Sequence, residues 1–341
     1  MNNFWNNRRV LITGHTGFKG VWLSKWLDML GAHTMGYSLP PDNYSLYDKI
    51  CFSANHQSLY ADVRDRVSLT NAIREFEPEI IFHLAAQAIV ETAREKPAVT
   101  FETNVMGTVN LLEAVRNAPC VKSIIVITSD KVYDNIESYV PYIESDRLGG
   151  SEPYSASKAC EELAVLAYRN VILSTKTIGI ATARASNVYG GGDLHYDRLI
   201  PYLIHSKIQN TKVAIRNPEA VRPWQYVLSP IYGYMLLAEA LYHEPDKYSE
   251  AFNFGPPEDE LVTVGELSSL IAGTGNITVE KRSLHEAGLL LINSMKSCEC
   301  LGWKPILDLR SGLDRTELFY REIGHGKNVT ELFEREIEKF I

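Results

Sequence analysis

The chain has 341 residues, of which 45% are hydrophobic and 22% charged, a composition typical of a globular protein with one large domain or two. Its formal net charge of -8 provides no general basic surface, so nucleic acid and membranes are poor candidates as partners. Five cysteines at irregular positions form no disulfide framework and no CxxC metal pair, and no apolar run has the length of a signal peptide or a membrane span. We therefore expect a cytoplasmic protein without a metal site.

Strands and helices alternate along the first half of the chain. The first strand, Arg9–Thr13, leads through a glycine turn into a helix that Gly31 ends. Further strands are predicted at His33–Tyr37, Ser58–Ala61, Glu79–His83, Ser123–Thr128 and Thr177–Ala183, with helices at Val67–Phe76, at Val99–Arg116 and from about Tyr154. This alternation predicts an α/β fold of the Rossmann type, with a doubly wound parallel sheet.

The rhythm changes at about residue 190, where prolines separate isolated helical stretches and short strands. We expect a Rossmann domain over residues 1–188 and a smaller C-terminal α/β substrate lobe over residues 189–341. Segments of the lobe can pass back into the sheet, so this boundary is a soft one.

The glycine turn predicts a dinucleotide site. Three glycines spaced GxxGxxG lie where the pyrophosphate of a dinucleotide meets a helix N-terminus, and they allow the turn, the close approach of phosphate and the packing of helix on strand. The predicted cofactor-binding residues of this turn are Gly14, Thr16, Gly17, Phe18, Lys19 and Gly20. The second strand ends at Tyr37, Ser38 and Leu39, without the acid of many NAD sites and without the arginine of many NADP sites.

Two groups of polar residues indicate acid–base chemistry. Tyr154 and Lys158 are four residues apart on one predicted helix and therefore share a face, where the lysine ammonium favours ionisation of the phenol. Ser129, Asp130 and Lys131 follow the fifth strand at its carboxyl end, the edge at which α/β proteins collect their chemistry. The Asp-Lys pair supplies a second acid and base beside the first.

Six segments carry a specific family resemblance. They are GHTGFKG (14–20), ITSDKVYDN (127–135), GGSEPYSASK (149–158), NVYGGGD (187–193), DRLIP (197–201) and IRNPEAVRPWQYV (215–227). In this order, between about Arg9 and Gly302, they resemble the CDP-glucose branch of the nucleotide-sugar 4,6-dehydratases, which are extended short-chain dehydrogenases/reductases. Other sugar dehydratases usually carry Asp-Glu where this chain has Asp130-Lys131.

The resemblance implies an NAD-dependent lyase of deoxysugar and cell-surface polysaccharide biosynthesis. It would convert CDP-glucose, or a related NDP-hexose, to the 4-keto-6-deoxy sugar through transient oxidation at C4, water loss across C5–C6 and hydride return to C6. Tyr154 would take the proton of the C4 hydroxyl, which Ser129 hydrogen-bonds. Lys131 would assist removal of the C5 proton and Asp130 would protonate the departing C6 hydroxyl.

The resemblance also implies where the ligands bind. Further cofactor-binding residues would be Asp62, Val63, Leu84, Ala85, Ala86, Gln87 and Asn104, together with Tyr154 and Lys158. The nucleotide sugar would be held by Asn187, Arg198, Leu199, Arg216 and Arg222 in the C-terminal lobe. A homodimer, or a tetramer, is expected through the helix that carries Tyr154.

Two alternatives remain at this point. A nucleotide-sugar 4-epimerase, or another NAD-dependent sugar oxidoreductase, shares the glycine turn and the YxxxK pair but has no use for Asp130 and Lys131. A non-catalytic NAD-sensing protein of the same fold tends to lose the tyrosine or the lysine, and this chain keeps both. The segment QAIVETA (87–93) departs from the CDP-glucose branch near the expected sugar site, which leaves the hexose open.

Overall fold

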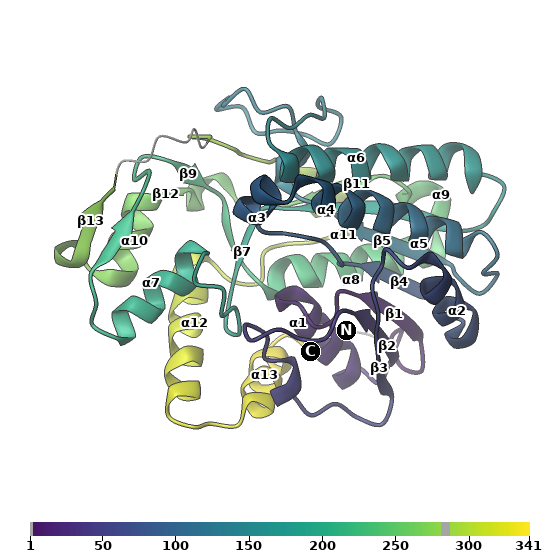
Figure 1. Cartoon of the computed structure of the whole chain (residues 1–341), viewed down its shortest axis with the longest axis horizontal. Coiled ribbons are helices and arrows are strands. Elements are labelled where there is room, and N and C mark those ends of the chain that lie inside the picture. Colours follow the sequence, from purple (N-terminus) through teal and green to yellow (C-terminus); the bar gives the residue numbers. More distant parts are fainter. Residues whose placement is uncertain (1–2, 281–286) are drawn as a thin grey trace.

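The main sheet of the computed structural model, which describes residues 3–280 and 287–341, has seven parallel strands in the order β11-β6-β5-β4-β1-β2-β3 (Figure 1). In chain order the strands are β1 (Arg9–Thr13), β2 (His33–Ser38), β3 (His56–Tyr60), β4 (Ile80–His83), β5 (Ser123–Ile127), β6 (Gly179–Ala185) and β11 (Ala251–Phe254). The predicted doubly wound parallel sheet is confirmed. The strand at one edge, β11, comes from the chain beyond residue 189.

The central strands are buried on both sides because they carry apolar side chains without alternation. Every residue of β4 (IIFH) and β5 (SIIVI) is buried, as expected of parallel strands covered by helices on both faces. Strand β3 (HQSLY) forms the edge of the sheet and is mostly exposed. The centre of the sheet is therefore buried, and its β3 edge is exposed.

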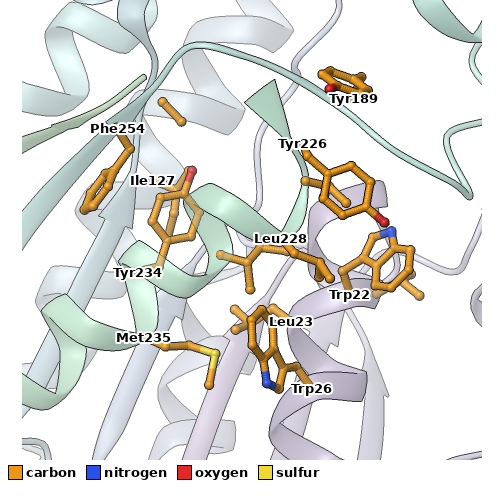
Figure 2. Close-up of a cluster of buried hydrophobic side chains, with 14 of the residues drawn as sticks. Trp22, Leu23, Trp26, Ile127, Tyr189, Tyr226, Leu228, Tyr234, Met235 and Phe254 are labelled. Carbon is orange, nitrogen blue, oxygen red and sulfur yellow. The ribbon is translucent and has the colours of Figure 1, made fainter. Parts of the chain in front are cut away.

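Helices cover both faces of the sheet. On one face α1 (Phe18–Met29) and α8 (Leu228–His243) pack with the strands in a single core, and Figure 2 shows Trp22 and Trp26 of α1 close to Leu228 of α8. The other face is covered by α2 (Arg66–Phe76), α5 (Gly107–Val115) and α6 (Pro153–Ala167). Complete burial of such apolar side chains stabilises a fold by about 1.5–3 kcal/mol each.

The helix predicted over Val99–Arg116 is interrupted. It consists of α4 (Pro97–Phe101), a π-helical turn at Glu102–Met106 and α5. A π turn adds one residue to the helical spacing and often lies at a functional site. Here it directs the side chain of Asn104 into the protein interior, where Asn104 is fully buried.

The smaller lobe begins at the carboxyl edge of the sheet, since β6 runs almost directly into its first strand, β7 (Asn187–Tyr189). It contains the strand pairs β7 with β10 (Trp224–Tyr226), β9 (Val221–Arg222) with β12 (Val262–Thr263) and β8 (Val213–Ile215) with β13 (Ile277–Val279). The remaining α-helices of the described residues are α3 (Val90–Glu95), α7 (Leu199–Ile208), α9 (Pro245–Tyr248), α10 (Val264–Ala272), α11 (Met295–Leu301), α12 (Leu309–Gly324) and α13 (Val329–Glu338). No helix in residues 3–280 and 287–341 is long and apolar enough to cross a membrane.

Candidate active site

The glycine turn lies against the segment that follows β4. Gly14 has a φ of +72°, and a Cβ atom there would lie 2.7 Å from the backbone nitrogen of Ala85. A Cβ atom at Gly20 would collide with the carbonyl oxygen of Gly14. Helix α1 starts at its N-cap Gly17 with no side-chain cap and no acidic residue in its first turn, among the residues described. Its first amide groups are therefore open to an anion, and the turn fits a dinucleotide pyrophosphate.

Thr16 and Lys19 of the turn contact different parts of the protein. The Thr16 hydroxyl lies 2.8 Å from the Ser38 hydroxyl and donates to the Leu39 carbonyl oxygen at 3.1 Å, which ties the turn to the end of β2. Lys19 instead faces the catalytic side, with its ammonium 3.5 Å from the Tyr234 hydroxyl. Burial, together with the charges of nearby cations, lowers the pKa of Lys19 to about 7.

The predicted cofactor-binding residues Asp62 and Val63 lie in the segment after β3. Asp62 accepts hydrogen bonds from the Arg64 amide at 2.8 Å and from its guanidinium at 2.7–3.1 Å, and these contacts lower the pKa of the carboxyl. Val63 is buried against Gly107 of α5. The structure thus places Asp62 in an ion pair with Arg64, a partner that the sequence analysis did not foresee.

Asn104 links the turn after β4 to the catalytic helix. Its side-chain oxygen accepts from the Gln87 amide at 2.8 Å, and its amide nitrogen donates to the Gln87 carbonyl at 3.1 Å and to the Ser157 hydroxyl at 2.8 Å. Within this turn, the Leu84 and Ala85 amides donate to Thr13 at the end of β1, at 3.1 and 3.2 Å. These bonds hold three predicted cofactor-binding segments in one arrangement.

Ser129, Asp130, Lys131 and Tyr154 converge at the end of β5. The Ser129 hydroxyl donates to the Asp130 carboxylate at 2.9 Å and accepts from the Lys131 amide at 3.2 Å. The Lys131 ammonium lies 5.7 Å from the centre of the Tyr154 ring. Burial raises the pKa of Asp130, although Lys131, Ser129 and the charge of Arg222 oppose the rise. The protonated form of this carboxyl is therefore favoured more than in an exposed aspartate.

The tyrosine and lysine of the YxxxK pair are both buried. Burial raises the pKa of Tyr154, while the charge of Lys158 and a hydrogen bond with Ser129 act to lower it. Lys158 acts in the direction expected from the sequence, but burial outweighs it in the free protein. The Lys158 ammonium donates to the Ile127 carbonyl at 3.2 Å and to the Glu161 carboxylate at 2.9 and 3.2 Å.

Three of the predicted substrate-binding residues lie around this centre. Arg198 forms an ion pair with the buried Asp193 at 2.8 Å, and its charge lowers the pKa of Lys19. Leu199, the next residue, begins α7. Arg222, in β9, donates to the Val221 carbonyl oxygen at 2.9 Å, and its charge reaches Asp130.

The remaining two substrate candidates are placed differently. Asn187 lies in β7 opposite Trp224 of β10, and its amide donates to the Pro223 carbonyl at 3.0 Å. Arg216 follows β8 and lies 3.7 Å from Glu91 of α3, so it bridges the lobe to the segment after β4.

The sequence analysis missed two acids on α6. Glu161 pairs with Lys158, and Glu162 accepts from the Thr128 hydroxyl at 2.6 Å and from Arg184 of β6 at 2.9 and 3.0 Å. The spacing of three residues between Lys158 and Glu161 was a signal that could have found the first pair. The second pair joins positions far apart in the chain, and no local pattern predicts it.

No metal-binding cluster is present in residues 3–280 and 287–341: no three His, Cys, Asp or Glu side chains are placed to share an ion. His83 of β4 is a core histidine, as its apolar strand predicts. Its ring nitrogens lie 2.7 Å from the Thr13 hydroxyl and 3.1 Å from the Thr108 hydroxyl, and burial lowers its pKa to about 3.

The parallel sheet, the glycine turn and the Tyr154–Lys158 pair together define an extended short-chain dehydrogenase/reductase. Comparison with known proteins narrows this class. The family model described as GDP-mannose 4,6 dehydratase matches residues 11–316. The chain is 41% identical to the CDP-glucose 4,6-dehydratase of Salmonella typhimurium (strain LT2), over 99% of this chain and 98% of that protein. It therefore belongs to the nucleotide-sugar 4,6-dehydratase family, whose enzymes are hydro-lyases, and the predicted family is confirmed.

Solved structures agree with this fold. The dTDP-glucose 4,6-dehydratase DesIV of Streptomyces venezuelae, solved with NAD and TYD bound, superposes with a TM-score of 0.80 at 25% identity, over 92% of this chain and 97% of that one. The epimerase Mth375 of Methanothermobacter thermautotrophicus superposes with a TM-score of 0.84 at 23% identity, over 95% of each chain. The second likeness shows the fold alone.

Proposed function

We propose that this protein is an NAD-dependent CDP-glucose 4,6-dehydratase that produces the 4-keto-6-deoxy sugar. The observation that carries the proposal is the packing of Asp130 and Lys131 beside Tyr154, because water loss needs an acid and a base in addition to the base of the oxidation. The high identity with the Salmonella CDP-glucose enzyme over the whole chain supports the choice of substrate.

The first role belongs to Tyr154. It accepts the proton of the C4 hydroxyl, and Ser129, which hydrogen-bonds the phenol, is placed to hold the same hydroxyl. Lys158 is buried, and its positive charge stabilises the phenolate that accepts the proton. Bound NAD would supply the hydride acceptor for C4 and the hydride donor for C6.

The second role belongs to the Asp-Lys pair. The C4 ketone acidifies the C5–H bond, Lys131 takes the C5 proton, and the electron pair forms the C5–C6 double bond as the C6 hydroxyl leaves. When hydride later adds at C6, Lys131 gives the proton back to C5. Asp130 gives that hydroxyl a proton, so that it departs as water. Burial raises the pKa of Asp130, which is the direction that suits a general acid. This assignment separates a dehydratase from a 4-epimerase.

The cofactor proposed is NAD. The open N-terminus of α1 would hold the pyrophosphate, and Asn104 with the turn after β4 would fix the neighbouring backbone. Ser38 and Leu39 at the end of β2 contact Thr16 and offer no cation to a 2′-phosphate, which favours NAD over NADP. The NAD bound in the DesIV structure supports the same choice.

The nucleotide sugar would lie between the sheet and the smaller lobe. Arg198 and Arg222, whose charges reach Lys19 and Asp130, would bind the diphosphate, since a guanidinium fork matches phosphate oxygens. Asn187, Leu199 and Arg216 complete the proposed substrate set.

We also propose a cytoplasmic homodimer. Leu163 and Leu166 on α6 are 54% and 41% exposed, which gives the helix an apolar face that a second copy would cover. The five cysteines are free thiols, in keeping with a reducing compartment.

A panel of CDP-, dTDP-, UDP- and GDP-hexoses, each with NAD or NADP, tests this function by mass spectrometry of the products. CDP-glucose with NAD is expected to give the fastest turnover, and its product is expected to be lighter by one water. The Tyr154→Phe protein, prepared in the same way, controls for contaminating enzymes. A product of unchanged mass would identify an epimerase and contradict the proposal, and faster turnover of another nucleotide would contradict the choice of CDP.

A further inference from the structure

Glu161 is a buried acid whose side chain forms an ion pair with the catalytic lysine. Its side chain is 1% exposed and that of Lys158 is 4% exposed. Both carboxylate oxygens accept from the Lys158 ammonium, at 2.9 and 3.2 Å, and Lys158 is its hydrogen-bond partner in the described chain. A buried carboxylate is costly to desolvate, and this cost is offset only by a close counter-ion. The ionisation of Glu161 is therefore tied to Lys158.

The neighbouring acid shows the contrast. Glu162 is also buried, but it accepts from Thr128, Thr182 and Arg184, so it joins α6 to strands β5 and β6. Its contacts hold secondary structure together and leave Lys158 aside. Two adjacent acids on one helix thus have different partners, and only one of them is bound to the YxxxK pair.

We propose that Glu161 is a positioning residue that sets the base strength of Tyr154 by holding the Lys158 ammonium in place and offsetting part of its charge. The proposal rests on the proposed function in one respect, because it takes Tyr154 as the base of the first step. With Ile127, Glu161 fixes the ammonium from two sides, so its distance from the phenol is set by the protein rather than by solvent.

The charges around the phenol support this balance. Lys158 lowers the pKa of Tyr154, whereas Asp130 and Glu161 raise it. The other titratable groups that face this cluster are Lys19 of the glycine turn, His83 of β4, Lys131 after β5, Glu162 of α6 and Tyr234 of α8. Burial raises the pKa of Glu161 even against Lys158, which indicates how little solvent screens the pair.

Removal of the Glu161 charge has two consequences. The Lys158 charge is no longer offset, so the phenolate form of Tyr154 is favoured and the tyrosine titrates at lower pH. Lys158 itself loses its counter-ion while it stays buried, so it also releases its proton at lower pH. Glu161→Gln should therefore move both limbs of the pH profile of kcat to lower pH. A purely structural glutamate would change stability and leave the profile in place.

The decisive measurement is an NMR titration of the full chain with tyrosine isotopically labelled at Cζ, in which Tyr154→Phe assigns the signal of Tyr154. In Glu161→Gln the pKa of Tyr154 is expected to fall by about one pH unit or more. In Glu161→Asp the carboxylate lies farther from the lysine, so the pKa of Tyr154 is expected to lie between its values in the parent and in Glu161→Gln. The control Glu336→Gln removes an equally buried acid that pairs with Arg315 and Lys339, and it should leave the Tyr154 signal unchanged.

The outcomes separate the two proposals. An unchanged or raised pKa of Tyr154 in Glu161→Gln would overturn the role of Glu161. If that variant does not fold, the same signal in Glu161→Asp decides the question, and a value at or above the parent value overturns the role. The titration needs no substrate, so it tests Glu161 even if the sugar panel were to contradict the proposed reaction.

Discussion

The centre of the sheet and its β3 edge differ in how deeply their ion pairs are buried. At the centre, β5 and β6 are fully buried, and the ion pairs Lys158–Glu161 and Arg184–Glu162 lie out of water. At the edge, β3 is exposed, and the pair Arg64–Asp62 has side chains that are 41% and 26% exposed. Breaking a buried pair costs about 3–5 kcal/mol, whereas an exposed pair contributes about 0–1 kcal/mol. The ion pairs at the centre are therefore expected to matter more for stability than the Arg64–Asp62 pair at the edge.

The sharpest way to break this comparison is to remove the base at the centre. Tyr154→Phe deletes the hydroxyl that accepts the C4 proton and should reduce turnover by about 10²–10⁴-fold or more, because both oxidation and water loss follow from that step. Rapid-quench analysis should find neither a 4-keto sugar nor a dehydrated product. An exposed change at the edge, Arg64→Gln, serves as the control and should alter cofactor affinity alone. Near-parental turnover by Tyr154→Phe would remove the catalytic assignment.

Variants of the Asp-Lys pair should slow water loss without slowing oxidation at C4. Asp130→Asn or Lys131→Met leaves Tyr154 and Lys158 intact, so oxidation at C4 should continue while water loss slows by about 10²–10⁴-fold. Single-turnover measurements should then show reduced nicotinamide and a 4-keto-hexose that accumulate before water leaves. If both variants lose water at the parent rate, the pair is an ordinary loop charge and the argument against an epimerase fails.

The partly buried His56 should have a smaller effect, on the pH dependence of the unfolding free energy. Burial lowers the pKa of His56, at the edge, to about 4, from a value near 6.5. The neutral form is therefore favoured in the fold, and its contribution to stability is present above pH 6.5 and lost as the pH falls toward 4. Glu161 and Asp130, whose pKa values are raised, act in the opposite direction. The test must therefore compare variants rather than follow the parent alone.

In urea unfolding, His56→Gln should remove this loss. Between pH 7 and pH 5.5 the parent should lose about 1 kcal/mol of unfolding free energy relative to the variant. The hydrogen bonds of His56 to Thr34 and Tyr47 change in the variant at both pH values, so the difference between the two measurements isolates the titration. An equal pH dependence in the two proteins would contradict the depressed pKa.

Sequence patterns predicted the centre better than the edge. A run of apolar residues without alternation predicts a buried strand such as β5. The place of Ser129 follows from that strand, and the place of Tyr154 from the helix that carries it. The π turn that buries Asn104 was outside the reach of these patterns, because it depends on what the helix packs against. The pairing of β11 with β6 was likewise invisible, since it joins residues about 70 positions apart in the sequence.

The edge was harder because its contacts are made by loops. Asp62 was expected to bind the cofactor, and only the structure shows that its carboxylate accepts a hydrogen bond from Arg64. Tertiary ion pairs of this kind depend on backbone turns that no period of apolar residues encodes.

The most direct test of the central claim is the fate of the hydrogen at C4. CDP-glucose labelled with deuterium at C4 is converted in ordinary water with NAD present, and the product is analysed by NMR and mass spectrometry. Oxidation at C4, water loss through Asp130 and Lys131, and reduction at C6 predict a 4-keto-6-deoxy sugar that carries the label at C6. A product that keeps both its oxygen at C6 and its label at C4 would contradict this account and identify the protein as an epimerase.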